Sequence, residues 1–261
     1  MTQKRIPALQ RILGRVYALY ALLMFIITIL LVAIPVSLAH LLVRDDRRRT
    51  KIVMDSYRVW MGVYLPLIGC PVTRTGQEHF RPDTTYVVVY NHNSLADVLV
   101  STPYVPGASK TLAKKELARI PVFGLIYRSG SVLVDRSDPN SRLKSIEDMK
   151  AVLAQGMHMI LYPEGTRNKT SAPLKPFYKG AFKVAVESQH PIVPALIFHT
   201  REILPPGLSF YAWPHRIRIR YMPPVPTAGL GPDDVPALTE KIFHQMRDGY
   251  IAGAGGNAGK A

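Results

Sequence analysis

A run of about 28 residues without Asp, Glu, Lys or Arg, from Val16 to Val43, constrains the fold more than any other feature of the sequence. Within it, the segment from Leu19 to Ile34 is apolar on every face of a helix. About 20 such residues suffice to cross the hydrocarbon core of a bilayer, so we expect this run to lie in lipid. A secretory signal is disfavoured, because its apolar core typically has only about 7–15 residues.

Basic residues flank the apolar run on both sides. They are Lys4, Arg5, Arg11 and Arg15 before it, and Arg44, Arg47, Arg48, Arg49 and Lys51 after it. Since basic flanks tend to stay cytoplasmic, this near-symmetry gives no clear orientation for a single span. It is also compatible with a segment that enters the membrane and returns, bent near Pro35.

A second apolar stretch, from Ile52 to Ile68, carries only two charged residues, and three large aromatic residues punctuate it: Tyr57, Trp60 and Tyr64. Such residues favour the headgroup level of a bilayer, which would make this stretch an interfacial helix. A helix that packs on a globular domain explains the pattern equally well. The periodicity does not separate these two interpretations.

The chain is strongly basic, with 33 Lys and Arg against 18 Asp and Glu and a formal net charge of +15. Residues 1–51 hold 9 basic and 2 acidic side chains of this set. The excess predicts an anionic partner: a nucleic acid, an anionic membrane or a phosphorylated substrate. Nucleic acid is disfavoured because no recognisable nucleic-acid motif accompanies the basic residues. The lone Cys70 cannot form an intrachain disulfide, so a cytoplasm-facing protein is the default.

After residue 83 the pattern changes to short apolar runs that alternate with helical ones. We expect buried strands at residues 86–90, 157–162 and 192–198, a half-exposed strand near an edge at 216–221, and helices that start at 95, cover 143–153 and close the chain at 237–250. The alternation predicts an α/β fold with a mostly parallel central sheet flanked by helices, joined to the N-terminal membrane-embedded helical segment. The expected organisation is an anchoring segment over residues 1–70, an α/β domain over 71–251 and a disordered Gly/Ala tail over 252–261.

The segment from Asn91 to Asp97 follows the first expected strand and carries the first candidate site. On a regular helix His92 and Asp97 would lie about 140° apart, so they meet only if His92 lies in the turn and Asp97 in the first helical turn. A helix N-cap at Asn93 or Ser94 allows that arrangement. A carboxylate beside an imidazole then forms a general-base pair, in which Asp fixes the tautomer. A capping His in a turn is the competing interpretation of an isolated motif.

The hexapeptide from Tyr162 to Arg167 follows another expected strand, at the sheet edge where α/β folds place ligands. Arg167 offers a planar fork suited to a phosphate. A structural turn with a solvated Glu164 and Arg167 is the alternative.

A third region contains basic side chains at Lys114, Lys115 and Arg136. These residues could bind phosphate, or they could form a solvated surface, which is the commoner role of surface charge.

Five sequence blocks occur in a fixed order at compact intervals. They are Asn-His-x4-Asp at 91–97, Lys-Lys followed by Pro-x2-Gly and Gly-x4-Asp-Arg over 114–136, Tyr-Pro-Glu-Gly-Thr-Arg at 162–167, Phe-x-Lys-Gly at 177–180 and Ile-Val-Pro-Ala at 192–195. This combination resembles the glycerolipid acyltransferase family, and within it the 1-acylglycerol-3-phosphate acyltransferases. The resemblance covers roughly residues 55–225, and the blocks at 91–97 and 162–167 match the family pattern without a departure.

The resemblance implies an acyltransferase of the EC 2.3.1 type that moves a fatty acyl group from acyl-CoA or acyl-carrier protein to the 2-hydroxyl of 1-acylglycerol-3-phosphate, giving phosphatidic acid. It implies that His92 is the general base and that Asp97 orients it. No metal and no cofactor beyond the acyl co-substrate is expected. Another lysolipid or glycerol-3-phosphate remains open as the acceptor, and a lipid hydrolase is a further alternative.

The resemblance also assigns substrate-binding residues. They are Glu164, Gly165, Thr166 and Arg167 in the acceptor-binding block, with Arg167 the phosphate ligand, and Lys114, Lys115 and Arg136 in the second block. Which of the two lysines faces the site stays open. Backbone amides near Gly165 are the expected oxyanion stabilisers.

The expected partners are a membrane lipid acceptor, the acyl donor and an anionic membrane, whose surface attracts the basic flanks. The expected location is a cell membrane of the bacterial inner-membrane type, with the active site on the cytoplasmic side.

Overall fold

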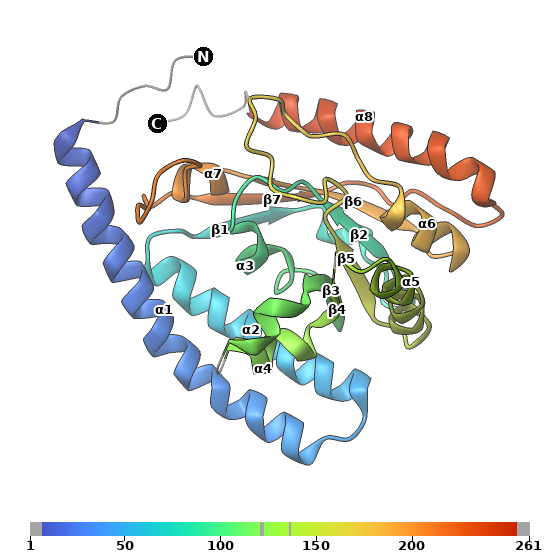
Figure 1. Ribbon diagram of the computed structural model, residues 1–261, viewed down its shortest axis with the longest axis horizontal. Helices are drawn as coiled ribbons and strands as arrows, with labels where there is room; N and C mark the ends of the chain where they lie inside the picture. The colour runs from blue at the N-terminus through green and yellow to red at the C-terminus, as the bar shows by residue number, and fades with distance from the viewer. Residues whose placement is uncertain (1–6, 121–122, 136, 255–261) are drawn as a thin grey trace.

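The computed structural model describes residues 7–120, 123–135 and 137–254. In this part of the chain seven strands form one sheet in the order β1-β7-β6-β2-β5-β3-β4 (Figure 1). The strands are β1 (Val72–Thr75), β2 (Val87–Tyr90), β3 (Ser109–Lys114), β4 (Ser131–Val134), β5 (His158–Leu161), β6 (Ile192–Phe198) and β7 (Ile217–Tyr221). The neighbours are parallel except for β6 and β7. The expected α/β fold with a mostly parallel sheet is therefore confirmed.

Eight α-helices lie in the described residues. They are α1 (Ala8–Leu42), α2 (Asp46–Leu67), α3 (Asp97–Ser101), α4 (Phe123–Ser129), α5 (Pro139–Ala154), α6 (Gly180–Glu187), α7 (Thr200–Ile203) and α8 (Val235–Ala254). Short 3-10 turns at Gln77–His79, Lys115–Arg119 and Pro232–Asp234 complete the connections.

Helices cover both faces of the sheet, so its central strands are buried on two sides. Val88 and Tyr90 of β2 pack in the apolar cluster formed with α1 and α2. Val87 and Val89, whose side chains point to the opposite face, pack in the cluster formed with α5, α6 and α8. This explains why β2, β5 and β6 are continuous apolar runs without alternation.

Strand β7 alternates as its sequence suggests, with Ile217, Ile219 and Tyr221 buried and the two arginines between them more exposed. It lies second from the edge, because β1 pairs with it on the outside. The edge itself is β1, a four-residue strand, and short edge strands limit unwanted pairing.

Helix α1 is one continuous helix from Ala8 to Leu42 that includes Pro35. The chain reverses after it, at residues 43–45, where the Asp45 side chain accepts a hydrogen bond from the Arg48 N–H and caps α2. The return therefore lies beyond the end of α1 and not at the expected bend near Pro35. Among the described helices, α1 alone is long and apolar enough to cross a membrane.

The stretch from 52 to 68, left open between an interfacial and a core helix, belongs to α2 and packs on the domain. Tyr57, Trp60 and Tyr64 are all buried. Tyr57 donates a hydrogen bond to the Val98 carbonyl at 3.3 Å. The aromatic side chains therefore face inward, between α1 and the sheet.

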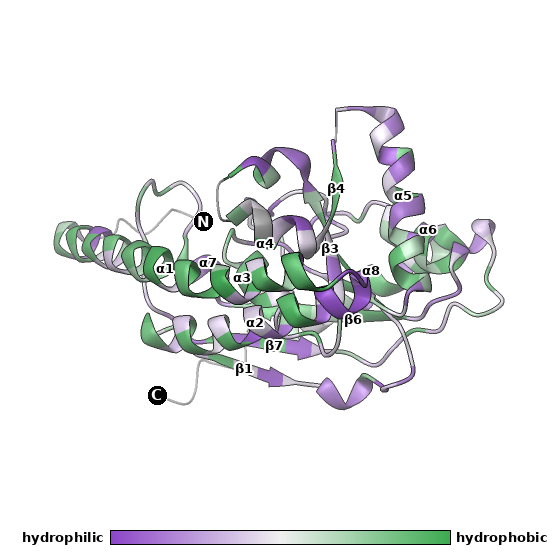
Figure 2. Cartoon of the chain, turned by 90° about the horizontal axis from the view of Figure 1, so that it is seen from below, coloured by the Kyte–Doolittle hydropathy of each residue, from purple (hydrophilic) through white to green (hydrophobic). Residues whose placement is uncertain are grey.

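Helix α1 packs along α2 over much of its length. The Trp60 indole N–H donates to Thr28 Oγ1 at 2.8 Å, and the Tyr64 hydroxyl donates to the Ala21 carbonyl at 3.2 Å. The opposite side of α1 exposes large apolar side chains, with Leu41 79% and Leu31 64% exposed. Figure 2 shows this apolar character along most of the helix.

The expected boundaries can be placed on these elements. Helix α2 ends at Leu67 and β1 begins at Val72, so the boundary expected at 70 falls in the connection between them. Helix α8 continues through Ala254, so the first three residues of the tail expected to be disordered are helical. The other residues of that tail, 255–261, lie outside the described residues.

Candidate active site

The His92 and Asp97 side chains form a hydrogen-bonded pair at the carboxyl end of β2. His92 lies in the turn after the strand and Asp97 is the first residue of α3. His92 Nδ1 and Asp97 Oδ2 are 2.9 Å apart. Because a carboxylate oxygen only accepts, Nδ1 carries the hydrogen, and in the neutral imidazole Nε2 then holds the lone pair. His92 also lines a cavity.

Asp97 is fully buried and has donors on both oxygens. Oδ2 also accepts the backbone N–H groups of Asn93 at 2.6 Å and Ser94 at 2.7 Å. Oδ1 accepts a hydrogen bond from the Thr200 hydroxyl. Four donors therefore fix the carboxylate, and through it the imidazole orientation.

The His92 ring stacks on the Tyr162 ring, with centroids 4.3 Å apart and an interplanar angle of 29°. The Tyr162 hydroxyl donates to Ser101 Oγ at 2.7 Å. Burial, reinforced by the nearby Asp97 charge, holds the pKa of Tyr162 well above its usual value. Tyr162 is therefore a neutral platform for the imidazole.

Glu164, expected to bind the acceptor, is buried and is not among the residues that line the cavity. Its Oε1 accepts the His92 backbone N–H at 2.7 Å, and its Oε2 accepts the Lys175 N–H at 2.9 Å. Burial raises the pKa of this carboxyl, and the two N–H donors oppose the shift. Glu164 therefore ties the His92 turn to the loop that follows β5, and its expected role in acceptor binding stays a prediction.

The cavity beside His92 has a volume of about 730 Å³. It is lined by His92, Leu95, Val98, Thr111, Leu112, Ala113, Lys114, Leu117, Tyr127, Tyr162, Gly165, Thr166, Arg167, Lys169, Thr170 and Lys175. The structure thus brings together five of the predicted site residues with His92 among them. The set combines apolar side chains from α3, β3 and α4 with cationic ones from the loop after β5, so the cavity suits an amphiphilic ligand.

The two lysines left open are now separated, because Lys114 lines the cavity and Lys115 does not. Lys115 begins the 3-10 turn after β3 and is exposed, near Asp135. Lys115 therefore lies outside the lining of this cavity, and its expected role in substrate binding stays a prediction. Arg136 lies outside the described residues.

Gly165 adopts a left-handed conformation with φ of 69°, and a Cβ there would lie 2.7 Å from the Tyr178 ring. The Gly165 N–H donates to the Tyr162 carbonyl at 3.0 Å, and the Thr166 N–H donates to the Glu164 carbonyl at 2.8 Å. These two amides close the turn. In this structure the Gly165 and Thr166 N–H groups donate within the turn, and the expected oxyanion stabilisation by backbone amides near Gly165 stays a prediction.

Sequence reasoning did not find Thr200, Lys169 or Lys175. Thr200 carried a usable signal, because it follows the buried strand 192–198 at the same sheet edge as His92. Lys169 and Lys175 lie in an irregular loop, whose path no periodicity predicts. The Lys175 ammonium donates to Thr166 Oγ1 at 2.6 Å, which shows how that loop folds back over the cavity.

Residues 71–198, which contain His92, Asp97 and the 162–167 block, match a protein-family model described as "Acyltransferase". The chain contains an acyltransferase-family domain. Among similar proteins, human 1-acyl-sn-glycerol-3-phosphate acyltransferase alpha is 36% identical over 188 residues, which cover 69% of this chain and 64% of the relative. The coconut 1-acyl-sn-glycerol-3-phosphate acyltransferase is 33% identical over 163 residues, 62% of this chain and 52% of the relative. The matched segment thus spans less than two thirds of these relatives.

The acyltransferase-family domain and the N-terminal helices together share the fold of a solved structure. The 1-acyl-sn-glycerophosphate acyltransferase PlsC from Thermotoga maritima superposes with a TM-score of 0.79, covering 94% of this chain and 97% of that one at 22% identity. The arrangement of α1 and α2 on the α/β domain therefore belongs to a fold that has been seen before.

Proposed function

We propose that this protein transfers a fatty acyl group from an acyl thioester, acyl-CoA or acyl-carrier protein, to the 2-hydroxyl of 1-acylglycerol-3-phosphate. The observation that carries the proposal is the buried Asp97 that fixes His92, which lines one cavity together with Arg167 and Lys114. The similarity to relatives that are named for this reaction supports it.

In the proposed reaction, His92 Nε2 takes the proton of the acceptor hydroxyl as its oxygen attacks the thioester carbonyl carbon. Asp97 stabilises the resulting imidazolium through Nδ1. The tetrahedral intermediate then expels the thiolate, the C–S bond breaks, and the imidazolium returns its proton to the sulfur. The acceptor supplies the nucleophile, so no serine or cysteine of the protein is required.

The acceptor phosphate is assigned to the cationic side of the cavity. Arg167 is exposed and lines it together with Lys114 and Lys169. A guanidinium can bind two phosphate oxygens at once, which fixes the orientation of the glycerol backbone relative to His92.

Association with an anionic membrane through α1 is part of the proposal. The apolar side chains that α1 exposes would be buried in lipid. Arg44, Arg47 and Arg48, which follow α1, would be attracted to anionic headgroups. Because α1 and the cavity belong to one folded unit, the active site would work at the membrane surface, on the cytoplasmic side of a bacterial-type inner membrane.

The test measures phosphatidic acid formed from 1-acylglycerol-3-phosphate and acyl-CoA or acyl-carrier protein in membranes that contain the protein. General-base catalysis contributes about 10²–10⁴-fold, so His92→Ala protein should lose activity by at least that range. Arg167→Ala should raise KM for the phosphate acceptor more than it lowers kcat. Normal turnover by His92→Ala protein would refute the mechanism.

A panel of acceptors distinguishes this reaction from acyl transfer to other acceptors and from hydrolysis. Glycerol-3-phosphate, other lysophospholipids and a phosphate-free lysolipid are compared at a fixed donor concentration. Activity confined to the phosphate-free acceptor would remove the phosphate role of Arg167. Release of free fatty acid without any acceptor would identify a hydrolase instead.

A further inference from the structure

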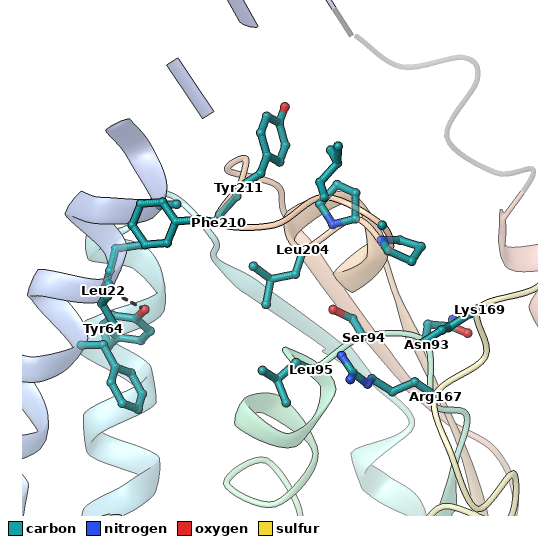
Figure 3. A pocket seen from close by; sticks show the side chains of 18 residues that line it. Leu22, Tyr64, Asn93, Ser94, Leu95, Arg167, Lys169, Leu204, Phe210 and Tyr211 are labelled. Carbon is teal, nitrogen blue, oxygen red and sulfur yellow. Dashed lines mark hydrogen bonds between the residues drawn. The ribbon is translucent and has the colours of Figure 1, made fainter. Parts of the chain in front are cut away.

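A second cavity, of about 540 Å³, lies between α1, α2 and the segment 204–212. Its walls include Ala18, Ala21 and Leu22 of α1, Phe210 of the 204–212 segment, and Arg167 and Lys169. Figure 3 shows Arg167 and Lys169 on one side of this space and Leu22, Tyr64 and Phe210 on the other. The cavity therefore has a cationic end and an apolar end.

This cavity is joined to the active site through shared walls. Leu95, Arg167 and Lys169 line it and also line the cavity that holds His92. A ligand whose anionic group lies at Arg167 can therefore extend in two directions, toward His92 or toward α1. The apolar surface along the second direction comes mainly from α1 and the 204–212 segment.

We propose that this second cavity holds the acyl tail of the single-chain phospholipid acceptor, with its phosphate at Arg167 and Lys169. The inference rests on the proposed function and deepens it by assigning one cavity to each substrate. The His92 cavity then receives the donor acyl chain. An acceptor with one tail and one phosphate matches the polarity of the second cavity from end to end.

The position of α1 supports this assignment over the donor. The wall formed by Ala18, Ala21 and Leu22 belongs to the helix whose outer side exposes apolar residues such as Leu23, 51% exposed. A lipid can reach this wall from a bilayer along an apolar path. A thioester donor carries a large, strongly polar group, which is poorly suited to an apolar path through a bilayer and would arrive from water.

Two substitutions on α1 test the assignment, with an adjacent control. Ala18→Leu fills the cavity, Leu22→Ala enlarges it, and Leu23→Ala changes an exposed leucine that does not line it. Each protein is assayed for kcat/KM with a short-tailed and a long-tailed 1-acylglycerol-3-phosphate and one fixed acyl-CoA. The donor is then varied in chain length with one fixed acceptor.

The proposal predicts opposite shifts in acceptor preference. Each buried methylene improves binding roughly fourfold, so an Ala18→Leu side chain that displaces about two methylenes of the tail should reduce the preference for the long-tailed acceptor roughly 16-fold. Leu22→Ala should move the preference the other way, because a longer tail can fill the space. Leu23→Ala should match the wild-type protein, and the donor preference should stay constant in all three.

Two results would overturn the proposal while the protein remains active. A shift in donor preference, with acceptor preference constant, would assign the cavity to the donor chain. Unchanged preferences in both Leu22→Ala and Ala18→Leu would show that the cavity holds neither tail. Wild-type protein that forms no phosphatidic acid would instead refute the proposed function itself, which separates the two failures.

Discussion

At the scale of single residues, the His92 and Asp97 pair depends on a hydroxyl that no sequence block contains. Thr200 is fully buried and donates to Asp97 Oδ1, while the other three donors reach Oδ2. Thr200 is a positioning residue: it acts through Asp97 and lies outside the lining of both cavities.

Replacing Thr200 with Val keeps the side-chain shape and removes the donor. A buried acceptor left without a partner costs about 1–3 kcal/mol, so we expect kcat to fall about tenfold or more with little change in KM. Thr200→Ser should restore most of the rate. Steady-state kinetics of both variants, with thermal unfolding as the folding control, measure the effect. Equal losses in the Ser and Val variants would contradict a role for the hydroxyl.

Another buried residue, His158, links stability to pH. Burial lowers the pKa of His158 from 6.5 to about 4. Its Nδ1 accepts the Tyr86 backbone N–H at 3.0 Å, so protonation of that nitrogen would break the bond. The unfolded chain binds a proton between these two pH values and the folded protein does not. The free energy of unfolding should therefore fall as pH drops from about 6.5 to about 4.

The expected loss is about 1.4 kcal/mol per pH unit within that window, or roughly 3 kcal/mol in total. His158→Asn supplies a non-titrating acceptor at the same place and should flatten the dependence. Denaturant unfolding in detergent at several pH values measures it. The exposed His244→Asn control should keep the wild-type slope, and an unchanged slope in His158→Asn would contradict the assignment.

At the scale of elements, α1 packs closely against the 204–212 segment at Gly14. A Cβ at Gly14 would lie 2.1 Å from the Tyr211 ring, and the Ala212 N–H donates to the Gly14 carbonyl at 3.2 Å. Gly62 in α2 is the natural comparison, because a Cβ there meets nothing within 4 Å.

The two glycines should respond oppositely to the same substitution. Gly62→Ala should stabilise the protein by about 0.5–1 kcal/mol through helix propensity. Gly14→Ala gains the same propensity but must displace Tyr211, so a net loss of stability is expected. Thermal unfolding of both variants in detergent measures whether each substitution raises or lowers the stability of the protein. A stabilised Gly14→Ala protein would mean that α1 and the segment do not pack in this way.

The sequence predicts elements well where the physical signal is local. The strand expected at 192–198 has those bounds in the structure, because a continuous apolar run as short as seven residues is typical of a strand buried on both faces. The 52–68 stretch stayed ambiguous, since its aromatic residues satisfy a membrane interface or a core equally. Contacts with Val98 and Thr28, distant in sequence, decide the question.

The candidate site shows the same difference between local sequence signals and contacts that are distant in sequence. His92 and Arg167 follow the parallel neighbouring strands β2 and β5, whose carboxyl ends share one sheet edge, and both line the same cavity. The expected acceptor-binding role of Glu164 stays a prediction, and only the folded loop shows that two backbone N–H groups donate to its carboxylate. Thr200 was missed because its partner Asp97 is 103 residues away.

At the scale of the whole molecule, α1 contacts the rest of the protein near both of its ends. Ala212 binds Gly14 near one end, and the Ser129 hydroxyl bonds to His40 Nε2 at 2.5 Å near the other. A helix held at both ends by the α/β domain cannot cross a bilayer while that domain stays on one side. We therefore expect α1 to lie within one leaflet.

Thiol labelling in sealed membrane vesicles tests this disposition. Arg15→Cys and Arg44→Cys place one thiol near each end of α1, and the native Cys70 is fully buried and should not react. An impermeant maleimide should label both positions from the same side as the α/β domain. Labelling of only one position from that side, and of the other after the membrane is opened, would show a spanning helix.

The attachment of α1 along the domain has a kinetic consequence. An enzyme that binds its acceptor from the membrane, next to its own lipid-facing helix, draws on acceptor that diffuses in two dimensions. Its rate then follows the mole fraction of acceptor in the lipid surface. Inert lipid would then act as a diluent, slowing turnover at constant bulk acceptor concentration. The mole fraction of acceptor in the leaflet, more than its concentration in the cell as a whole, would set the turnover rate of such a protein.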